Sequence, residues 1–283
     1  MVAYVKIYEE RIRAIPKLMC RILGYLGSPL LLEQLVSKPE HSLIVQSYQP
    51  REMTSGVVNA DGFGIGWYHA QLDTEPFTYK NTLPIWNDAN LPSLSRYIES
   101  GCVLANIRSA TGGQAVDLSN CQPFSYKDLL FTHNGAIKNF RKTLYRPIRS
   151  LLNDEAYQLI EGITDSEHIF ALLINQLTTH SDITLEKALH NTLEIIKELA
   201  SLHQVSFSAN IIVSDGHRLV CSRFAHNVPV PSLYWLRDDP TFPEAVIVAS
   251  EPLFASNWIS FPENSIISFG EDLDINEQLT IIN

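Results

Sequence analysis

The pattern of apolar and polar residues predicts strands in the first half of the chain. Short apolar runs interrupted by small residues lead into polar turn residues at "CRILGYLG" (20–27), "NADGFGIGWYHA" (59–70), "CVLANIRSATGG" (102–113) and "DLLFTHNGAI" (128–137). Two other stretches predict short helices. One is "SPLLLEQLV" (28–36), with Ser28 at its start and Pro29 at its first position, and the other is "LPSLSRYIES" (91–100).

The middle of the chain has the 3.6-residue period of amphipathic helices. In "TDSEHIFALLINQL" (164–177), Thr164 and Glu167 have the spacing of a capping box, in which each side chain accepts a hydrogen bond from the other residue's backbone N–H. The apolar residues that follow recur on one face, and "TLEKALHNTLEIIKELASL" (184–202) repeats this spacing. We therefore expect two long consecutive helices.

Strand patterns return in the last third of the chain. The stretch "FSANIIVSDGHRLVCSRF" (207–224) predicts a hairpin in which Asp215 and Gly216 supply the positive φ angles of the turn. The stretch "AVIVASEPL" (245–253) predicts one more buried strand. Strands, two long helices and again strands predict an α+β fold whose helices pack on mostly antiparallel sheets.

Composition narrows the class of protein. The 283 residues are enough for one large core, and the net charge of −10 argues against a nucleic-acid surface, which needs clustered Lys and Arg. No apolar stretch is long enough to span a bilayer, and "YEERIR" interrupts the place where a secretory signal would be apolar. The four cysteines are far apart and have no metal-binding spacing, which predicts free thiols, a cytoplasmic location and no metal.

Four short polar motifs end or follow predicted strands or open a helix. They are "MCR" (19–21), "RSAT" (108–111), "THNG" (132–135) and "TDSE" (164–167). Taken singly, each is ordinary, because a cysteine in an apolar run is usually a core residue and an aspartate in a capping box usually complements the helix dipole. An arginine at a strand end usually forms a surface ion pair, and Asn-Gly is common in turns.

The order and spacing of these motifs resemble the class II glutamine amidotransferases, the glutaminases of the N-terminal-nucleophile superfamily. In that family a mature N-terminal cysteine is followed by an R-x-x-T strand end, an N-G turn and a D-[ST]-E helix start, and the resemblance runs from Cys20 to about residue 260. It implies a single domain over 20–283, built as a four-layer αββα sandwich of two mostly antiparallel sheets. It implies no metal or other cofactor.

The resemblance also implies the catalytic residues. Cys20 would be the nucleophile, and its own free α-amine would be the general base. The Asn134 side chain and the Gly135 backbone N–H would form the oxyanion hole. An α-amine with a pKa of about 7.7–8.0 is suited to taking a proton from a thiol near neutral pH. The expected intermediate is a γ-glutamyl thioester, which water then hydrolyses.

The remaining implied roles concern the γ-glutamyl group of the substrate. Arg108, supported by Thr111, would bind its α-carboxylate, and Asp165 would bind its α-ammonium. Many members of the family have a histidine two residues before the arginine, where this chain has Asn106, so the packing around the site is expected to differ there. His133 is expected to be structural, because the α-amine already serves as the base.

The substrate is a small γ-glutamyl molecule on this interpretation. With no acceptor domain in the same sequence, hydrolysis is simpler than ammonia transfer. The stretches "MCRILGYLG", "HSLIVQSYQPREM", "NADGFGIGWY" and "ANIRSATGG" are similar to the stand-alone branch that includes the γ-glutamyl hydrolase of ergothioneine biosynthesis. That branch implies γ-glutamyl-hercynylcysteine sulfoxide as substrate, with Trp67, Tyr68 or Trp86 suited to face its trimethylammonium group.

Three further functions stay open at this point. The first is a glutathione-type γ-glutamyl peptide hydrolase, with or without a partner subunit. The second is a glutaminase subunit that delivers ammonia to a separate synthase. The third is an inactive binding module whose Cys20 is never freed.

Residues 1–19 are expected to be absent from the mature protein. They show none of the features of the family, and the resemblance begins abruptly at Met19. A Cys20 joined to Met19 has an amide nitrogen, which is not basic, so the proposed base requires a free Cys20. We expect either translation from Met19 with removal of that methionine or cleavage after it.

Overall fold

The computed structural model describes residues 20–52, 58–69, 73–109, 116–270, 273 and 275–280. Within these ranges the strands form two sheets. The seven-stranded sheet contains β1 (Arg21–Leu31), β2 (Phe63–His69), β3 (Asp73–Asn81), β4 (Glu99–Ile107), β9 (Tyr234–Asp239), β10 (Phe242–Ala249) and β11 (Ile259–Ser260). The six-stranded sheet contains β5 (Phe124–Tyr126), β6 (Leu129–Ile137), β7 (Phe207–Ser214), β8 (Leu219–His226), β12 (Ser265–Phe269) and β13 (Ile275–Thr280).

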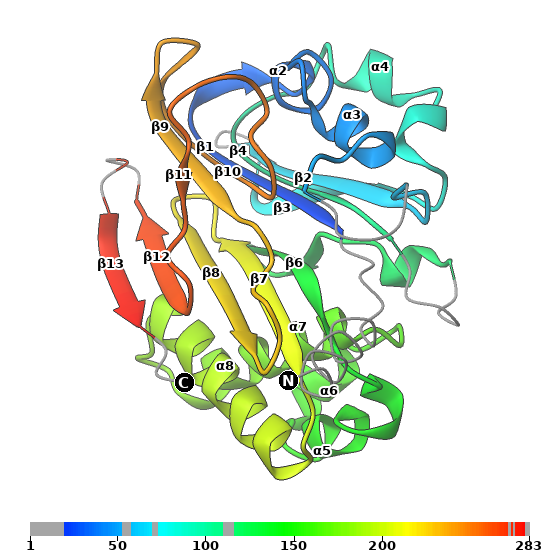
Figure 1. Ribbon diagram of the computed structural model, residues 1–283, viewed down its shortest axis with the longest axis vertical. Coiled ribbons are helices and arrows are strands. Elements are labelled where there is room, and N and C mark those ends of the chain that lie inside the picture. The colour runs from blue at the N-terminus through cyan, green and yellow to red at the C-terminus, as the bar shows by residue number, and fades with distance from the viewer. Residues whose placement is uncertain are drawn as a thin grey trace, which may run out of the picture.

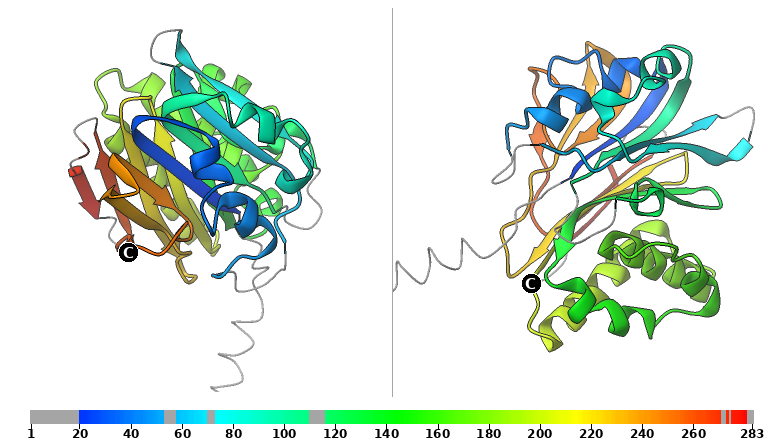
Figure 2. Two further views of the ribbon diagram at one scale, coloured as in Figure 1. Left: turned by 90° about the horizontal axis from the view of Figure 1, so that it is seen from above. Right: turned by 90° about the vertical axis from the view of Figure 1, so that its right-hand side faces the viewer.

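Helices cover the outer face of each sheet, so the molecule has four layers (Figures 1 and 2). On the six-stranded sheet lie α5 (Tyr145–Arg149), α6 (Asp154–Gln158), α7 (Asp165–Thr179) and α8 (Leu185–Leu202). On the seven-stranded sheet lie the short helices α2 (Glu33–Val36), α3 (Leu43–Tyr48) and α4 (Leu91–Leu94). Three single 3₁₀ turns, η1 (Ile85–Asn87), η2 (Leu118–Asn120) and η3 (Phe140–Lys142), complete the connections. The predicted αββα sandwich is confirmed.

The strand order places β1 at the centre of its sheet and β6 and β7 towards one side of the other. The orders are β11-β9-β10-β1-β4-β2-β3 and β13-β12-β8-β7-β6-β5, and all pairings between described strands are antiparallel. Within the described ranges, none of the helices combines the length and apolar character needed to cross a bilayer.

Alternate side chains of each strand enter different layers. In β1, Ile22 lies in the core between the two sheets, whereas Leu23 lies in the core beneath the short helices. In β6, Leu130 lies between the sheets and Phe131 packs against the long helices. Because side chains alternate along a strand, Cys20 shares the inter-sheet face of Ile22.

The glycines of β2 allow the second sheet to come close, as their pattern predicts. A Cβ on Gly64 would lie 2.2 Å from the backbone oxygen of Gln122, and one on Gly66 would lie 2.8 Å from Leu130 Cδ1. A larger residue at position 64 would therefore require movement of the backbone at Gln122, and one at position 66 would require the Leu130 side chain to shift.

The helix predicted at residues 28–36 is wrong for its first half. β1 continues to Leu31 through a register irregularity between Leu26 and Leu30, and α2 is a single turn. The reason is tertiary: Leu30 and Leu31 pair with Ser100 and Glu99 of β4, and this strand pairing overrides the local Ser-Pro helix signal. The helix predicted at 91–100 is likewise shorter, because its last two residues already belong to β4.

The turn predicted at Asn134–Gly135 is also wrong. Both residues lie inside β6 and pair with Asn210 and Ala209 of β7. The hairpin predicted over 207–224 is confirmed as the β7–β8 pair, but its turn differs in part, since Gly216 has φ +89° whereas Asp215 does not have a positive φ. The Asp215 carboxylate instead accepts hydrogen bonds from the backbone N–H groups of His217 and Arg218.

Both long helices begin with a threonine cap, and that of the first, Thr164, is the one predicted from the sequence. Thr164 Oγ1 accepts from the Glu167 N–H at 3.2 Å, and Thr184 accepts from the Lys187 N–H at 3.2 Å. The second half of the expected capping box is absent, because the Glu167 carboxylate accepts from the backbone N–H groups of Gly162 and Glu161. Glu167 therefore ties the preceding loop to the start of α7.

Candidate active site

Cys20 lies half-buried at the start of β1, with its thiol 3.9 Å from the backbone oxygen of Ser109. Burial raises the pKa of the Cys20 thiol, and the Asp165 charge adds to the rise, whereas the hydrogen bond to Ser109 and the guanidinium groups of Arg108 and Arg21 oppose it. Arg21 pairs with Ile107 in the ladder, so Cys20 and Arg108 lie at neighbouring ends of β1 and β4. A thiol with a raised pKa needs a base to react near neutral pH.

Arg108 follows β4 directly and is held by the entry to β2. Its N–H donates to Gly62 O at 2.8 Å, its carbonyl accepts from Asp61 N at 3.2 Å, and its Nη1 donates to Asp61 O at 3.2 Å. Gly62 has φ +109°, and a Cβ there would lie 2.7 Å from Cys121 Sγ. A glycine at position 62 is thus required for the backbone conformation that holds Arg108. Thr111, the predicted support of Arg108, lies outside the described residues.

The two predicted oxyanion groups lie next to each other on β6. The Asn134 side chain is on the inter-sheet face, and its Nδ2 donates to Ser250 Oγ at 3.4 Å. The backbone N–H groups of His133 and Ile137 donate away from β7, to Gln122 Oε1 and to Asp165 Oδ2. Because N–H direction alternates along a strand, the Gly135 N–H points to this same edge, between those two.

Asp165 borders this edge from the first turn of α7. Its Oδ2 accepts from Ile137 N at 2.7 Å and its Oδ1 from Ser166 N at 3.0 Å. These bonds fix a carboxylate at a helix N-terminus, where the dipole favours negative charge.

Gly135 has no room for a side chain. A Cβ there would lie 2.0 Å from Ser208 O and 2.5 Å from the His133 ring. His133 itself is on the helix side of β6, with Nδ1 paired to Ser166 Oγ at 2.8 Å and Nε2 to Ser208 O at 3.2 Å. Burial lowers the pKa of His133, although Asp165 and the bond to Ser208 oppose this. These contacts support the expected structural role.

Three buried residues beside Cys20 were not predicted from the sequence. The Glu251 carboxylate accepts from Arg21 Nε at 2.8 Å and pairs with His41 Nε2 at 2.6 Å, and Arg21 Nη1 donates back to Cys20 O at 3.0 Å. The one available signal was an arginine within a strand predicted to be buried, since a buried guanidinium requires a carboxylate. Nothing in the sequence identified Glu251 or His41 as that partner.

Asn106 lies close to this region on the inter-sheet face of β4. It pairs with Ile22 in the ladder, it is 1% exposed, and neither atom of its amide has a hydrogen-bond partner among the described residues. The packing difference expected at residue 106 therefore consists of a buried side-chain amide that has no hydrogen-bond partner among the described residues.

The aromatic residues suggested for the leaving group are mostly elsewhere. Trp67 packs on Phe77 in the outer layer, with ring centroids 4.9 Å apart, and the Tyr68 hydroxyl donates to Ser214 O between the sheets. Tyr68 is a buried core residue and Trp67 is half-buried against the outer core, so the structure does not place either ring at Cys20. Trp86 is 38% exposed and forms an edge-to-face pair with Tyr48.

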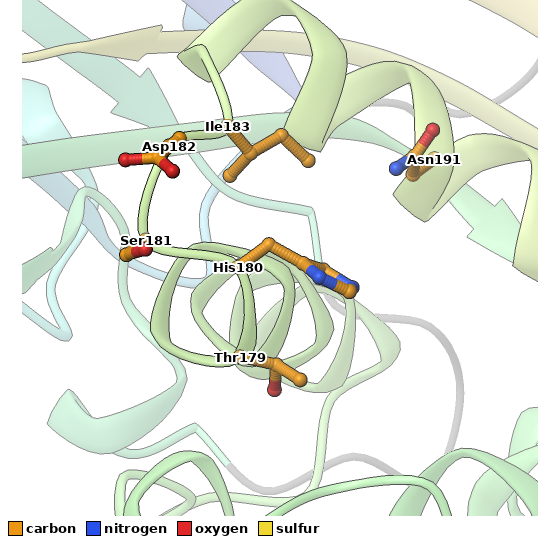
Figure 3. Close-up of a pocket in the computed structure, with 6 residues that line it drawn as sticks. All are labelled: Thr179, His180, Ser181, Asp182, Ile183 and Asn191. Carbon is orange, nitrogen blue, oxygen red and sulfur yellow. The ribbon is translucent and has the colours of Figure 1, made fainter.

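A surface pocket of about 550 Å³ lies at the opposite end of α7 from Asp165 (Figure 3). Its lining includes His180 and Asp182 in the connection to α8, and the 15 residues of α7 place it about 22 Å along the helix from Asp165. It is therefore not the site built around Cys20. No group of three or more His, Cys, Asp or Glu side chains in the described part of the chain is arranged to hold a metal ion.

The sequence matches a family model and several curated proteins. The model described as glutamine amidotransferases class-II matches residues 31–273. A probable glutamine amidotransferase of Saccharomyces cerevisiae, DUG3, is 31% identical over 294 residues, which cover 88% of this chain and 81% of the yeast protein. A γ-glutamyl-hercynylcysteine sulfoxide hydrolase of Mycobacterium tuberculosis is 30% identical over 250 residues, which cover 88% of this chain and 92% of the mycobacterial protein.

Solved structures show the same fold. A glutamine aminotransferase class-II domain protein from Silicibacter pomeroyi has a TM-score of 0.64 at 24% identity, over 89% of this chain and 95% of that one. The glutamine phosphoribosylpyrophosphate amidotransferase of Bacillus subtilis has a TM-score of 0.60 at 16% identity, over 89% of this chain and 47% of that one.

Proposed function

The chain belongs to the class II glutamine amidotransferases, and from this membership we propose that it hydrolyses γ-glutamyl-hercynylcysteine sulfoxide to hercynylcysteine sulfoxide and glutamate. The observation that supports the reaction type is the position of Cys20 and Arg108 at neighbouring ends of β1 and β4, with Ser250 Oγ linking β1 to Asn134 and Asp165 bonded to Ile137 on the same strand. The observation that supports the substrate is the similarity to curated hydrolases of that compound, at 30% identity over 88% of the chain.

In the proposed reaction Cys20 begins the mature protein. Its α-amine takes the thiol proton, and the sulfur attacks the γ-carbonyl carbon. The oxyanion accepts hydrogen bonds from Asn134 Nδ2 and the Gly135 N–H, each worth about 10²–10³ in rate. The ammonium then protonates the leaving nitrogen as the C–N bond breaks and a γ-glutamyl thioester remains. Water, deprotonated by the same amine, attacks the thioester and releases glutamate and the free thiol.

Substrate binding is proposed to fix the glutamyl head by its two charges. The planar guanidinium of Arg108, supported by Thr111, binds the α-carboxylate in a bidentate manner, and Asp165 binds the α-ammonium. A head group held by both charges would present its side-chain carbonyl to the Cys20 sulfur, because Cys20 and Arg108 lie at neighbouring strand ends.

The trimethylammonium of the leaving group is proposed to lie near Glu52 and Tyr234. The Tyr234 hydroxyl donates to Glu52 Oε1 at 2.8 Å, and the Glu52 N–H donates to Glu251, whose partner Arg21 contacts Cys20. Burial and the Glu52 carboxylate raise the pKa of Tyr234 to about 12, so the phenol stays protonated as a donor. An exposed carboxylate beside an aromatic ring suits a quaternary ammonium.

Glutamine is the second candidate substrate, because the yeast probable glutamine amidotransferase is as similar as the mycobacterial hydrolase. Three further functions compete with these two: hydrolysis of glutathione, delivery of ammonia to a separate synthase, and binding without turnover. A purified-enzyme assay separates all of them by measuring glutamate release from the hercynylcysteine conjugate, glutathione and glutamine.

We expect the conjugate to be hydrolysed at least about tenfold faster than the other two at equal concentration, and Glu52→Gln to remove most of that preference. A preference for glutamine or glutathione would refute the substrate assignment. Turnover that requires a second protein would favour the glutaminase subunit that delivers ammonia to a separate synthase. Cys20→Ala should abolish turnover with all three while the melting temperature stays within a few degrees of wild type, and residual turnover near wild type would refute the nucleophile.

A further inference from the structure

The hydroxyl of Ser250 connects the two sheets beside the nucleophile. Ser250 follows the last residue of β10 and is fully buried. Its Oγ accepts from the Ile22 N–H at 3.0 Å, in the strand that begins next to Cys20. The same oxygen accepts from Asn134 Nδ2 at 3.4 Å, in the other sheet. One atom thus joins the strand of the nucleophile to the side chain of the proposed oxyanion hole.

The ladder between β1 and β10 changes at this residue. The Ser250 N–H donates to Ile22 O at 3.0 Å, as in a regular antiparallel pair. In such a pair the reciprocal bond would run from the Ile22 N–H to the Ser250 carbonyl. That carbonyl instead accepts from Ser232 Oγ at 2.9 Å, and the Ser250 hydroxyl takes its place against β1. This replacement is what brings a side-chain oxygen, rather than a backbone carbonyl, to the boundary between the sheets.

The next residue holds Ser250 in position. Glu251 accepts from Arg21 and His41 and from the backbone N–H groups of Arg51 and Glu52. Arg21 in turn donates to Cys20 O. Because Glu251 is fully buried and bonded on both oxygens, the end of β10 has little freedom to move relative to Cys20.

The Asn134 amide needs such an anchor if it is to stabilise an oxyanion. Its Oδ1 has no hydrogen-bond partner in the described part of the chain, so only the bond from Nδ2 to Ser250 fixes which end of the amide faces which way. Without that bond, rotation about χ2 can present Oδ1 to the developing negative charge and repel it. Apolar packing between the sheets does not prevent this rotation, because it has no direction.

We propose, building on the proposed function, that Ser250 is a positioning residue that orients the Asn134 amide toward the oxyanion and sets it against the strand of the nucleophile. It touches neither the substrate nor the reacting atoms. Because Ser250 acts through Asn134, it contributes to stabilising the transition state rather than to binding the substrate.

A double-mutant cycle with Asn134→Ala tests this role. We expect Ser250→Ala to lower kcat about 10- to 100-fold with KM changed less than about threefold, because an oxyanion donor is lost or misplaced. In the Asn134→Ala background the same substitution should lower kcat less than about threefold, since nothing is left to orient. Equal effects in both backgrounds, or no effect in either, would refute the proposal.

Ser222→Ala is the matched control. Ser222 is also fully buried, and its hydroxyl also bonds a backbone group, the carbonyl of Ala209, but it lies on the helix-facing side of β8 and does not contact Asn134 in the described part of the chain. Its kcat should equal that of wild type, and both serine variants should lower the melting temperature by similar amounts. The cycle is measured on whichever γ-glutamyl substrate the wild type turns over. A wild type inactive on all of them refutes the proposed function, whereas an active wild type with an unaffected Ser250→Ala refutes this inference alone.

Discussion

Arg108 is positioned mainly through its backbone. Its N–H and carbonyl both bond to the Asp61–Gly62 entry of β2, and one guanidinium N–H also bonds to Asp61 O. The side chain is 3% exposed and begins from a fixed point one residue after β4. A guanidinium held in this way loses little further conformational entropy on binding a carboxylate.

Arg108→Lys should therefore weaken binding more than it slows chemistry. A lysine ammonium is a point charge and cannot replace a bidentate fork, so we expect KM to rise at least about tenfold with a smaller change in kcat. Steady-state kinetics on the preferred γ-glutamyl substrate measures the two constants. Arg218→Lys is the control. Arg218 lies in the remote β7–β8 hairpin, where it pairs with Asp215 and with Glu186 of α8, so this substitution should change neither constant. An unchanged KM in the Arg108 variant would contradict its role as the carboxylate clamp.

The residues that were predictable from sequence are those whose chemical type is distinctive. An arginine at a strand end, an aspartate opening a helix and a cysteine after methionine each have few competing roles once their order is matched to a family. Ser250 and Glu251 carry no such mark, because a Ser-Glu pair after an apolar strand is common on protein surfaces. Their role depends on Ile22, Asn134 and Arg21, which come from distant parts of the chain.

At the scale of elements, the local period of apolar residues was sufficient to predict the two long helices but not to predict where every strand begins and ends. α7 and α8 begin at Thr164 and Thr184 as predicted, because capping and a helical apolar face are local properties. The strand pairing of residues 28–31 and 134–135 was missed, because the partners, β4 and β7, are more than sixty residues away. The Asn-Gly pair predicts a turn only where no neighbouring strand supplies a partner.

The contact between β1, β10 and the end of α3 should depend on pH. Burial alone would raise the pKa of Glu251, but the Arg21 guanidinium, the His41 bond and the N–H groups of Arg51 and Glu52 lower it overall. A carboxylate whose folded pKa is lowered stabilises the fold above its ordinary pKa of about 4.3, and this stabilisation is lost as the pH falls through the lowered value.

The Glu251→Gln variant should therefore be less stable than the wild type near neutral pH, and this difference should be smaller in acid. Leaving a buried arginine without its carboxylate costs about 3–5 kcal/mol, and for a chain of this size we expect the melting temperature to fall by about 6 °C or more at pH 7. Thermal unfolding of both proteins between pH 7 and pH 3 measures the difference, which should narrow as the pH decreases. A constant difference over that range would show that the charge of Glu251 contributes no stability.

At the scale of the whole molecule, the reaction that we propose depends on groups from both sheets and from one helix layer. Cys20 and Arg108 come from the seven-stranded sheet, Asn134 and Gly135 from the six-stranded sheet, and Asp165 from the helix that covers it. The site therefore exists only when the sandwich is assembled. The remaining requirement concerns the covalent structure of Cys20, because the base that we propose is its own α-amine.

A chain that begins at Cys20 should be active, and one that retains residues before Cys20 should not be. With a peptide bond to Met19 the nitrogen is an amide, so we expect loss of general-base catalysis, about 10²–10⁴ in kcat. The two forms are compared directly, after mass spectrometry of the native protein has established its N-terminus. In the form that begins at Cys20, kcat/KM should rise with pH through the amine pKa of about 7.7–8.0, and the longer form should lack this inflection. Complete alkylation of Cys20 by iodoacetamide in both forms is the control that the thiol is accessible, since burial raises its pKa in either case. Equal turnover by the two forms, or a native N-terminus other than Cys20, would contradict the α-amine as the base.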